Sequence, residues 1–278
     1  MNKRRLALIL SCIGVLFLMT GCSTSNELIS LETKFTDVTH EGILSACLVY
    51  PLAQAINYLS AKVGVFWGIT IVAVALNAII ILCTFKMNVS MQRMQELQPE
   101  VQRIQLKYEG RNDSASQERM AAELNQLYKK NDVNPLGTLV TTFIQFPILI
   151  SMYSAVRRSA AVVNGTFLGA TLSTTPKEAL LTQQWVLVAI YVLMVVAQFL
   201  STNVQRWITI AREKKEAEIH HKHYEKPASA NGLMVYGMVA FIAIIMISWP
   251  TALSLYYLIY SCIMIAKTFI IDRITHKD

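Results

Sequence analysis

Charged residues are scarce in this chain of 278 amino acids, in which aspartate, glutamate, lysine and arginine together make up only 15%. Soluble domains carry about 25%, so the composition excludes an ordinary water-soluble domain. The scarcity is concentrated in four long runs that contain no Asp, Glu, Lys, Arg or His, at 63–85, 133–156, 179–205 and 227–266. Uncharged runs of this length are typical of membrane-spanning helices.

Five membrane-spanning helices are predicted from these four runs. About 20 helical residues cross a hydrocarbon core of roughly 30 Å, and the last run, with 40 residues, is long enough for two crossings. Trp249-Pro250 marks the break between them, because proline ends a helix and tryptophan favours the membrane interface. The predicted fold class is therefore an all-α integral membrane protein, with spans at 63–85, 134–156, 183–205, 231–249 and 251–271.

The absence of Asp, Glu and His from the predicted spans also limits the possible functions. A proton relay or a pair of catalytic carboxylates is missing, so we predict no enzyme activity. The main alternative function, a small-solute membrane transporter, would need ligands for a coupling ion and usually internal repeats, and the sequence shows neither. A structural lipoprotein anchor is a third alternative, but it does not explain five spans.

One cluster of histidines, His220, His221 and His223, has the spacing of metal ligands. Its neighbours are basic, which opposes the binding of a cation and favours a solvated linker. We therefore predict no metal site and no cofactor apart from a covalently attached lipid.

Cysteine is scarce as well, and the five cysteines show neither metal-ligand spacing nor a disulfide pattern. Cys47, Cys83 and Cys262 are expected to be small packing residues. Cys22 differs, because it follows a basic N-terminus and an apolar stretch and ends the sequence LMTGC, which resembles the lipobox of bacterial lipoproteins. We predict a lipoprotein signal peptide at 1–21 and a diacylglycerol or acyl lipid, such as palmitate, on Cys22; an uncleaved first span is the alternative.

Residues 22–62 connect the predicted lipid anchor to the first span. Within them, residues 26–42 are polar and are expected to form a tether. Residues 43–60 are apolar but are interrupted by a proline and two amides, which suits a helix lying in the outer membrane interface better than a span.

Lysine and arginine are distributed unequally between the two sides of the predicted bundle. Seventeen lie in 86–132, in 206–230 and from Lys267 onward, against five in the other connecting segments. Because positive residues accumulate on the cytoplasmic side, we predict a multi-pass protein of the bacterial plasma membrane with its N-terminus outside and its C-terminus in the cytoplasm. Arg157 and Arg158 lie on the opposite side and are expected to reach lipid headgroups.

The cytoplasmic segment 86–132 is predicted to form a helical hairpin. Apolar residues recur every three or four positions in both of its halves, as on one face of a helix, and residues 110–113 between them have the composition of a turn. Two amphipathic helices joined by a short turn pack antiparallel. Coiled-coil oligomerisation is the alternative, but each arm is too short to favour it.

Several segments resemble the YidC/Oxa/Alb family of membrane protein insertases, and in particular its lipoprotein members. They are VYPLAQAI before the first span, MQELQPEVQRIQLKY in the hairpin, NPLGTLVTTFIQFPILISMY in the second span and WPTALSLYYLIY in the fifth. The resemblance covers roughly residues 43–275. It implies five spans around a hydrophilic groove open to the cytoplasm, the non-catalytic insertion of nascent membrane proteins, a monomeric core, and the Sec translocon, the ribosome and membrane lipids as partners.

Three amides are predicted to lie at one depth in this bundle. Asn77, Gln145 and Gln198 are each about 12–15 Å from the cytoplasmic boundary if their segments are helical. Ordinary interhelical hydrogen bonds are the alternative for any one of them, but for the set we predict a hydrated groove. The further candidate groove residues are Thr141, Thr142, Tyr256, Tyr257, Tyr260 and Lys267.

The first span departs from the family in one respect. Members of the family usually have an arginine where this chain has Asn77, so a groove arginine is not carried over. Lys267, near the end of the fifth span, either extends to lipid phosphates, as long basic side chains near helix ends do, or supplies the positive charge at the mouth of the groove. The three tyrosines are expected to contact the departing helix of the substrate.

Overall fold

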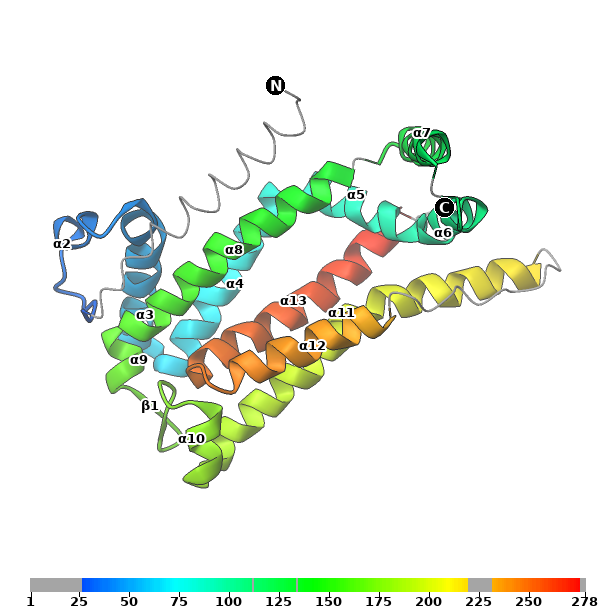
Figure 1. Cartoon of the computed structure of the whole chain (residues 1–278). Helices are drawn as coiled ribbons and strands as arrows, with labels where there is room; N and C mark the ends of the chain where they lie inside the picture. The colour runs from blue at the N-terminus through cyan, green and yellow to red at the C-terminus, as the bar shows by residue number, and fades with distance from the viewer. Residues whose placement is uncertain (1–26, 112, 134, 220–231, 276–278) are drawn as a thin grey trace. The chain divides into compact units, whose positions relative to one another are not determined.

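The computed structural model describes residues 27–111, 113–133, 135–219 and 232–275, and these are almost entirely helical (Figure 1). The predicted all-α fold is confirmed. The predicted signal peptide with Cys22, and the histidine cluster, lie outside the described residues.

The secondary-structure elements follow one another along the chain with short connections. The helices of the first half are α2 (Phe35–Thr39), η1 (Ser45–Val49), α3 (Tyr50–Val63), α4 (Val65–Cys83), α5 (Phe85–Glu96), α6 (Gln98–Lys107) and α7 (Ser114–Lys130). Those of the second half are α8 (Pro135–Arg158), α9 (Ala160–Asn164), α10 (Pro176–Leu181), α11 (Trp185–Ile219), α12 (Gly232–Met246) and α13 (Thr251–Thr275). Between α9 and α10, strands β1 (Thr166–Phe167) and β2 (Ala170–Thr171) pair antiparallel.

Three of the described helices are long and apolar enough to cross a membrane, namely Val65–Cys83, Trp185–Ile208 and Thr251–Ile274. They correspond to the first, third and fifth predicted spans. Helices α8 and α12 occupy the positions of the second and fourth, whose role as spans stays a prediction. Helix α11 also continues to Ile219, so the first part of the segment predicted as a basic loop is helical.

The chain divides into two compact units. Unit 1 comprises Met1–Leu76, Ile144–Ala197 and Ala240–Tyr260, and unit 2 comprises Asn77–Phe143, Gln198–Val239 and Ser261–Asp278. The five long helices α4, α8, α11, α12 and α13 each contribute one part to each unit.

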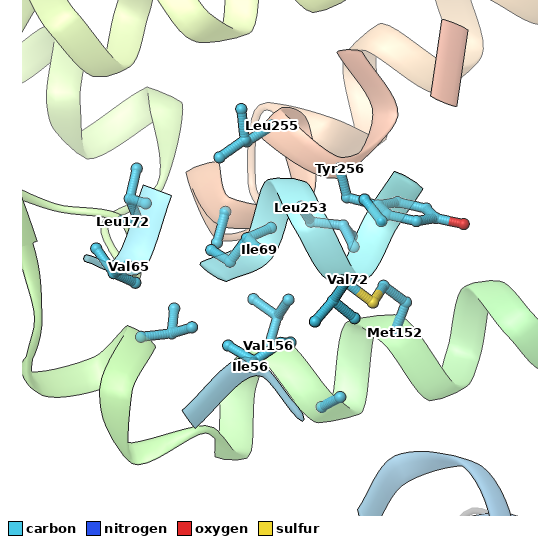
Figure 2. Close-up of a cluster of buried hydrophobic side chains, with 14 of the residues drawn as sticks. Ile56, Val65, Ile69, Val72, Met152, Val156, Leu172, Leu253, Leu255 and Tyr256 are labelled. Carbon is cyan, nitrogen blue, oxygen red and sulfur yellow. The ribbon is translucent and has the colours of Figure 1, made fainter. Parts of the chain in front are cut away.

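Unit 1 contains a large apolar core (Figure 2). Ile69 of α4, Met152 of α8, and Leu253 and Tyr256 of α13 are completely buried, and Ile56 of α3 joins them. Lipid tails are as apolar as leucine, so the core of a membrane protein is stabilised mainly by close packing of side chains rather than by transfer out of water.

The described residues that precede α2, from Glu27 onward, are bound to unit 1, and Ile29 among them is completely buried in its core. The expectation that Arg158 extends to lipid headgroups is wrong, because its side chain is only 7% exposed and forms an ion pair with Glu41. The neighbouring Arg157 is exposed and donates a hydrogen bond to the hydroxyl of Tyr153 at 3.0 Å.

The segment predicted as a cytoplasmic hairpin contains α5, α6 and α7, which all belong to unit 2. Helix α6 begins with Pro99 in its first turn, where the missing N–H leaves no unsatisfied donor. Glu123 of α7 accepts hydrogen bonds from the Lys107 ammonium at 2.6 Å and from the Tyr108 hydroxyl at 2.9 Å. These two bonds, that from Lys107 first, hold the pKa of the Glu123 carboxyl below its usual value. Asp113 caps α7 by accepting from the amide of Ser116.

Candidate substrate groove

Unit 2 buries polar side chains both on the apolar helices α4, α11 and α13 and on the polar helix α5. Its buried polar residues are Asn77 on α4, Thr84 beside it, Asn88 and Gln92 on α5, Gln198 and Asn203 on α11, and Ser261 and Thr268 on α13. An amide or hydroxyl without a partner in an apolar medium costs roughly 2–7 kcal/mol. Residues of this kind are therefore retained only where partners, water or a ligand satisfy them.

One polar contact joins α11 to α13. The hydroxyl of Ser261 donates to the side-chain oxygen of Gln198 at 2.8 Å. Gln198 is 8% exposed and Ser261 is completely buried. The amide NH₂ of Gln198 is left to donate to other acceptors, because the bond to Ser261 uses only its oxygen.

A second polar contact joins α13 to α5. The ammonium of Lys267 donates to the side-chain oxygen of Asn88 at 3.2 Å, and the Asn88 amide donates to the Thr84 hydroxyl at 2.9 Å. Thr84 donates in turn to the carbonyl of Ile80 at 2.7 Å. This chain of bonds directs the Lys267 side chain toward α5. One turn further along α5, the amide nitrogen of Gln92 is buried and has no hydrogen-bond partner among the described residues.

The structure places the predicted groove residues in different surroundings. Asn77, 1% exposed, and Gln198 are buried in unit 2. The side chains of Thr141, Thr142 and Gln145 fall in the part of α8 whose side chains are not described. Their predicted position in a groove therefore stays a prediction.

The three tyrosines of α13 belong to unit 1 and pack against one another. Tyr256 is completely buried and Tyr257 is 8% exposed, with their ring centroids 5.6 Å apart in an edge-to-face arrangement. Tyr260 is partly buried and stacks on Tyr256 at 6.4 Å. Tyr256 and Tyr257 are therefore core residues in this structure, and Tyr260 presents the larger accessible surface to a substrate.

Sequence reasoning missed several of the buried polar residues. Thr84, Asn88 and Gln92 recur at intervals of four, which places them on one face of the chain as it runs from α4 into α5. That periodicity was visible in the sequence and could have found them. Ser261 is one of several hydroxyl residues of α13 and was not among the predicted groove residues; Ser254, Ser261 and Thr268, all buried, recur at intervals of seven.

The described residues contain neither a disulfide nor a cluster of side chains that could bind a metal ion. Cys47, Cys83 and Cys262 are free and exposed, so the expectation that they pack internally is wrong. No group of three or more His, Cys, Asp or Glu side chains that could hold a metal ion is found among the described residues.

Comparison with known proteins identifies the family. A family model described as "60Kd inner membrane protein" matches residues 58–278. The "Membrane protein insertase MisCA" of Bacillus subtilis (strain 168) is 32% identical over 97% of this chain and 92% of its own length. The "Membrane protein insertase YidC 2" of Bacillus anthracis is 30% identical over 97% of this chain and 94% of its own length.

A third relative, the "Membrane protein insertase YidC" of Oceanobacillus iheyensis, is 26% identical over 98% of this chain and 97% of its own length. These similarities extend over nearly the whole of each chain, and the apolar helices of the structure agree with a protein of the bacterial membrane. The chain therefore belongs to the YidC/Oxa family of integral membrane proteins.

Proposed function

We propose that this chain is a membrane protein insertase, which moves segments of nascent membrane proteins from the cytoplasm into the bilayer without covalent chemistry. The observation that carries the proposal is the set of buried polar side chains of unit 2, above all Asn77, Gln198 with Ser261, and Asn88, which accepts from Lys267. The names of the three relatives support it.

In the proposed mechanism, the polar part of a substrate enters a hydrophilic groove formed by the polar residues of unit 2. Water and the side chains of Asn77, Gln198 and Ser261 replace part of the hydration of that segment, which lowers the free energy of its dehydration. The sequence prediction that Thr141, Thr142 and Gln145 of α8 also contact the substrate is kept as part of the proposal.

The apolar helix of the substrate then leaves the groove for the lipid, along α11 and α13, where Tyr260 is the accessible aromatic contact. Its burial supplies the driving force, at roughly 25 cal/mol per Å² of apolar surface removed from water. The proposal therefore needs neither a nucleotide nor an ion gradient.

The orientation in the membrane is part of the proposal. We place α5, α6, α7 and the C-terminus in the cytoplasm, because basic residues accumulate there, and α3 in the outer interface. Cys22 is proposed to carry a lipid outside. A Cys22→Ala variant should then retain its signal segment, and mature N-termini of wild type and variant whose masses differ only by the substitution itself would contradict lipidation.

The partners proposed are nascent membrane proteins, the Sec translocon, the ribosome and anionic lipids. The basic C-terminal part of α11, with Arg206, Lys214 and Lys215, and the α5–α7 segment are the surfaces proposed to meet the ribosome. The same positive charges would attract anionic headgroups, at about 1 kcal/mol for each residue near the surface.

Complementation tests the proposed function. The chain is expressed in cells depleted of their own insertase, and the insertion of a small two-span membrane protein is followed by protease protection of its exported loop. We expect insertion and growth to be restored. If the chain accumulates in the membrane at normal levels but restores neither insertion nor growth, the proposal is wrong. That result is the one expected of a small-solute transporter.

A further inference from the structure

Residues 27–41, here called the strap, form a bound element rather than a flexible connection to the first span. Ile29 is completely buried. Its amide donates to the carbonyl of Arg158 at 2.6 Å, and its carbonyl accepts from the amide of Ala160 at 3.0 Å, so that a parallel bridge joins Ile29 to Ser159. The strap is therefore attached through its backbone to the junction of α8 and α9.

Asn57 of α3 connects the strap to the same junction. Its amide nitrogen donates to the Ile29 carbonyl at 2.6 Å. Its amide oxygen accepts from the hydroxyl of Ser159 at 2.7 Å and from the amide of Ala161 at 2.9 Å. Asn57 is only 3% exposed. Its side chain forms hydrogen bonds with the strap, with Ser159 at the junction of α8 and α9, and with the first turn of α9.

Arg158, the last residue of α8, binds both ends of the strap. Its terminal nitrogens donate to the two carboxylate oxygens of Glu41 at 2.5 and 2.8 Å, and its Nε donates to the carbonyl of Glu27 at 2.9 Å. The two charged side chains are only 7% and 11% exposed. Bidentate pairs of this kind are strong and geometrically specific, and removing one partner leaves a buried charge without compensation.

The middle of the strap is held against α3, which lies beside α9 in Figure 1. The amide of Gln54 donates to the carbonyl of Ser30 at 2.7 Å, and the hydroxyl of Tyr50 donates to the carbonyl of Thr33 at 3.0 Å. The ring of Phe35 packs edge-on against Tyr50 at 5.6 Å. The strap thus runs from the end of α8 to α3 and back again. Arg158 closes it by binding both Glu27 and Glu41.

Helix α8 is not held equally along its length. Pro147 lies inside it, where proline has no N–H to donate to the preceding turn and weakens the helix. The contacts described above join the strap to the end of α8 that follows Pro147, at Arg158. The part that precedes Pro147 contains Thr141, Thr142 and Gln145, the residues of α8 that the proposed function assigns to the groove.

We propose that Arg158 is a positioning residue of the insertase, which acts by closing the strap and thereby fixing the end of α8 against α3. The fixed end serves as the base from which α8 extends toward its groove residues. The closure itself rests on the contacts above, whereas its effect on insertion rests on the proposed function. No contact between Arg158 and a substrate is involved.

Limited proteolysis tests the closure of the strap. Lys34 is exposed within the strap, but trypsin needs the backbone around it to open. In the full chain reconstituted in vesicles, we expect Arg158→Gln and Glu41→Gln to be cleaved after Lys34 about tenfold faster than wild type, because the opening free energy of the strap falls. Arg157→Gln is the matched control: it removes an exposed arginine from the same turn and should leave cleavage after Lys34 unchanged.

Insertion by the same variants separates positioning from simple stability. The double variant Arg158→Gln with Glu41→Gln no longer contains an unpaired buried charge, so it should regain the thermal stability that each single variant loses. We expect it still to be cleaved quickly after Lys34 and to insert a two-span substrate several-fold more slowly than wild type. Arg158→Lys, which keeps the charge but not the bidentate geometry, should fall between wild type and Arg158→Gln.

Two results would overturn the inference. One is cleavage after Lys34 in Arg158→Gln and in the double variant at the wild-type rate, which would show that Arg158 does not close the strap. The other is a double variant that inserts substrate as fast as wild type although its strap is open, which would reduce Arg158 to a purely structural role. If wild type itself inserts nothing, the proposed function fails, and the proteolysis still reports on the strap.

Discussion

In unit 1 the long helices bury Ile69, Met194 and Leu253, whereas in unit 2 the same three helices bury Asn77, Gln198 and Ser261. Each pair comes from one continuous helix, α4, α11 or α13 respectively. The change from aliphatic to polar burial therefore happens within helices, over about one to two turns, and not between separate domains.

The difference shows where stability and function reside. The packed core of unit 1 tolerates little change, because close-packed side chains in a membrane protein gain their energy from mutual contact. The polar residues of unit 2 contribute less to stability, since a hydrogen bond nets only about 1 kcal/mol. We infer that unit 1 provides the stability of the protein and that the buried polar residues of unit 2 serve to contact the substrate.

Deleting part of unit 2 while keeping unit 1 should have the largest effect. Removal of residues 95–125 eliminates α6 and most of α7, and the buried apolar side chains that it removes from the described residues are Leu97 and Val101. We expect insertion of a two-span substrate to be abolished while the membrane helices remain folded by circular dichroism in detergent. Normal insertion by the shortened chain would contradict a role for this segment.

Opening a cavity in unit 1 should have the next largest effect, on stability rather than on insertion alone. Leu253→Ala removes a completely buried side chain, and the cavity left behind costs about 2 kcal/mol even where the transfer term is small. The measurement is the free energy of unfolding in detergent. Leu193→Ala, at a position 55% exposed on α11, is the control and should change that free energy by less than about 0.5 kcal/mol.

Removing a polar contact from unit 2 should have the opposite result, in which insertion slows while the free energy of unfolding changes little. In the double variant Gln198→Leu with Ser261→Ala, both partners of the 2.8 Å bond disappear together, so no unsatisfied group remains and stability should change by less than about 1 kcal/mol. Insertion of substrates with long polar exported loops should nevertheless slow several-fold. Equal insertion by wild type and the double variant would show that this contact serves packing only.

The pH dependence of the α6–α7 contact should be the smallest effect. Lys107 and Tyr108 hold the pKa of Glu123 below its usual value, so their contact stabilises the folded segment above the unfolded pKa and is lost as pH falls through the lower, folded one. The reverse applies to Lys107, whose pKa is raised chiefly by the hydrogen bond to Glu123: its contribution is present below the unfolded pKa and is lost as pH rises through the folded one.

Spin labels at positions 103 and 126, both exposed, would report the distance between α6 and α7 as a function of pH. We expect that distance to widen in acid, below the ordinary carboxyl range, and again in strong alkali. Glu123→Gln should abolish the acid transition. A distance that is independent of pH in the wild type would show that Glu123 does not hold the two helices together.

Local patterns in the sequence were sufficient to predict much of this fold. Uncharged runs predicted α4, α11 and α13, because a span needs a certain length and a low charge, and both are local properties. The proline and glycine positions and the short polar segments predicted the connections between helices. The motifs in α6, α8 and α13 were enough to indicate the family, and Asn77 and Gln198 were recognisable as polar residues in apolar runs.

The partners of the side chains were decided only by the tertiary structure. Arg158 was predicted to reach lipid headgroups, but it pairs with Glu41, 117 positions away. Lys267 was predicted either to reach lipid phosphates or to supply charge at the groove mouth, and its ammonium donates to Asn88, 179 positions away. Tyr256 looked accessible and is completely buried. Sequence periodicity reports which face of a helix a residue occupies, whereas its partner depends on which distant segment packs against that face.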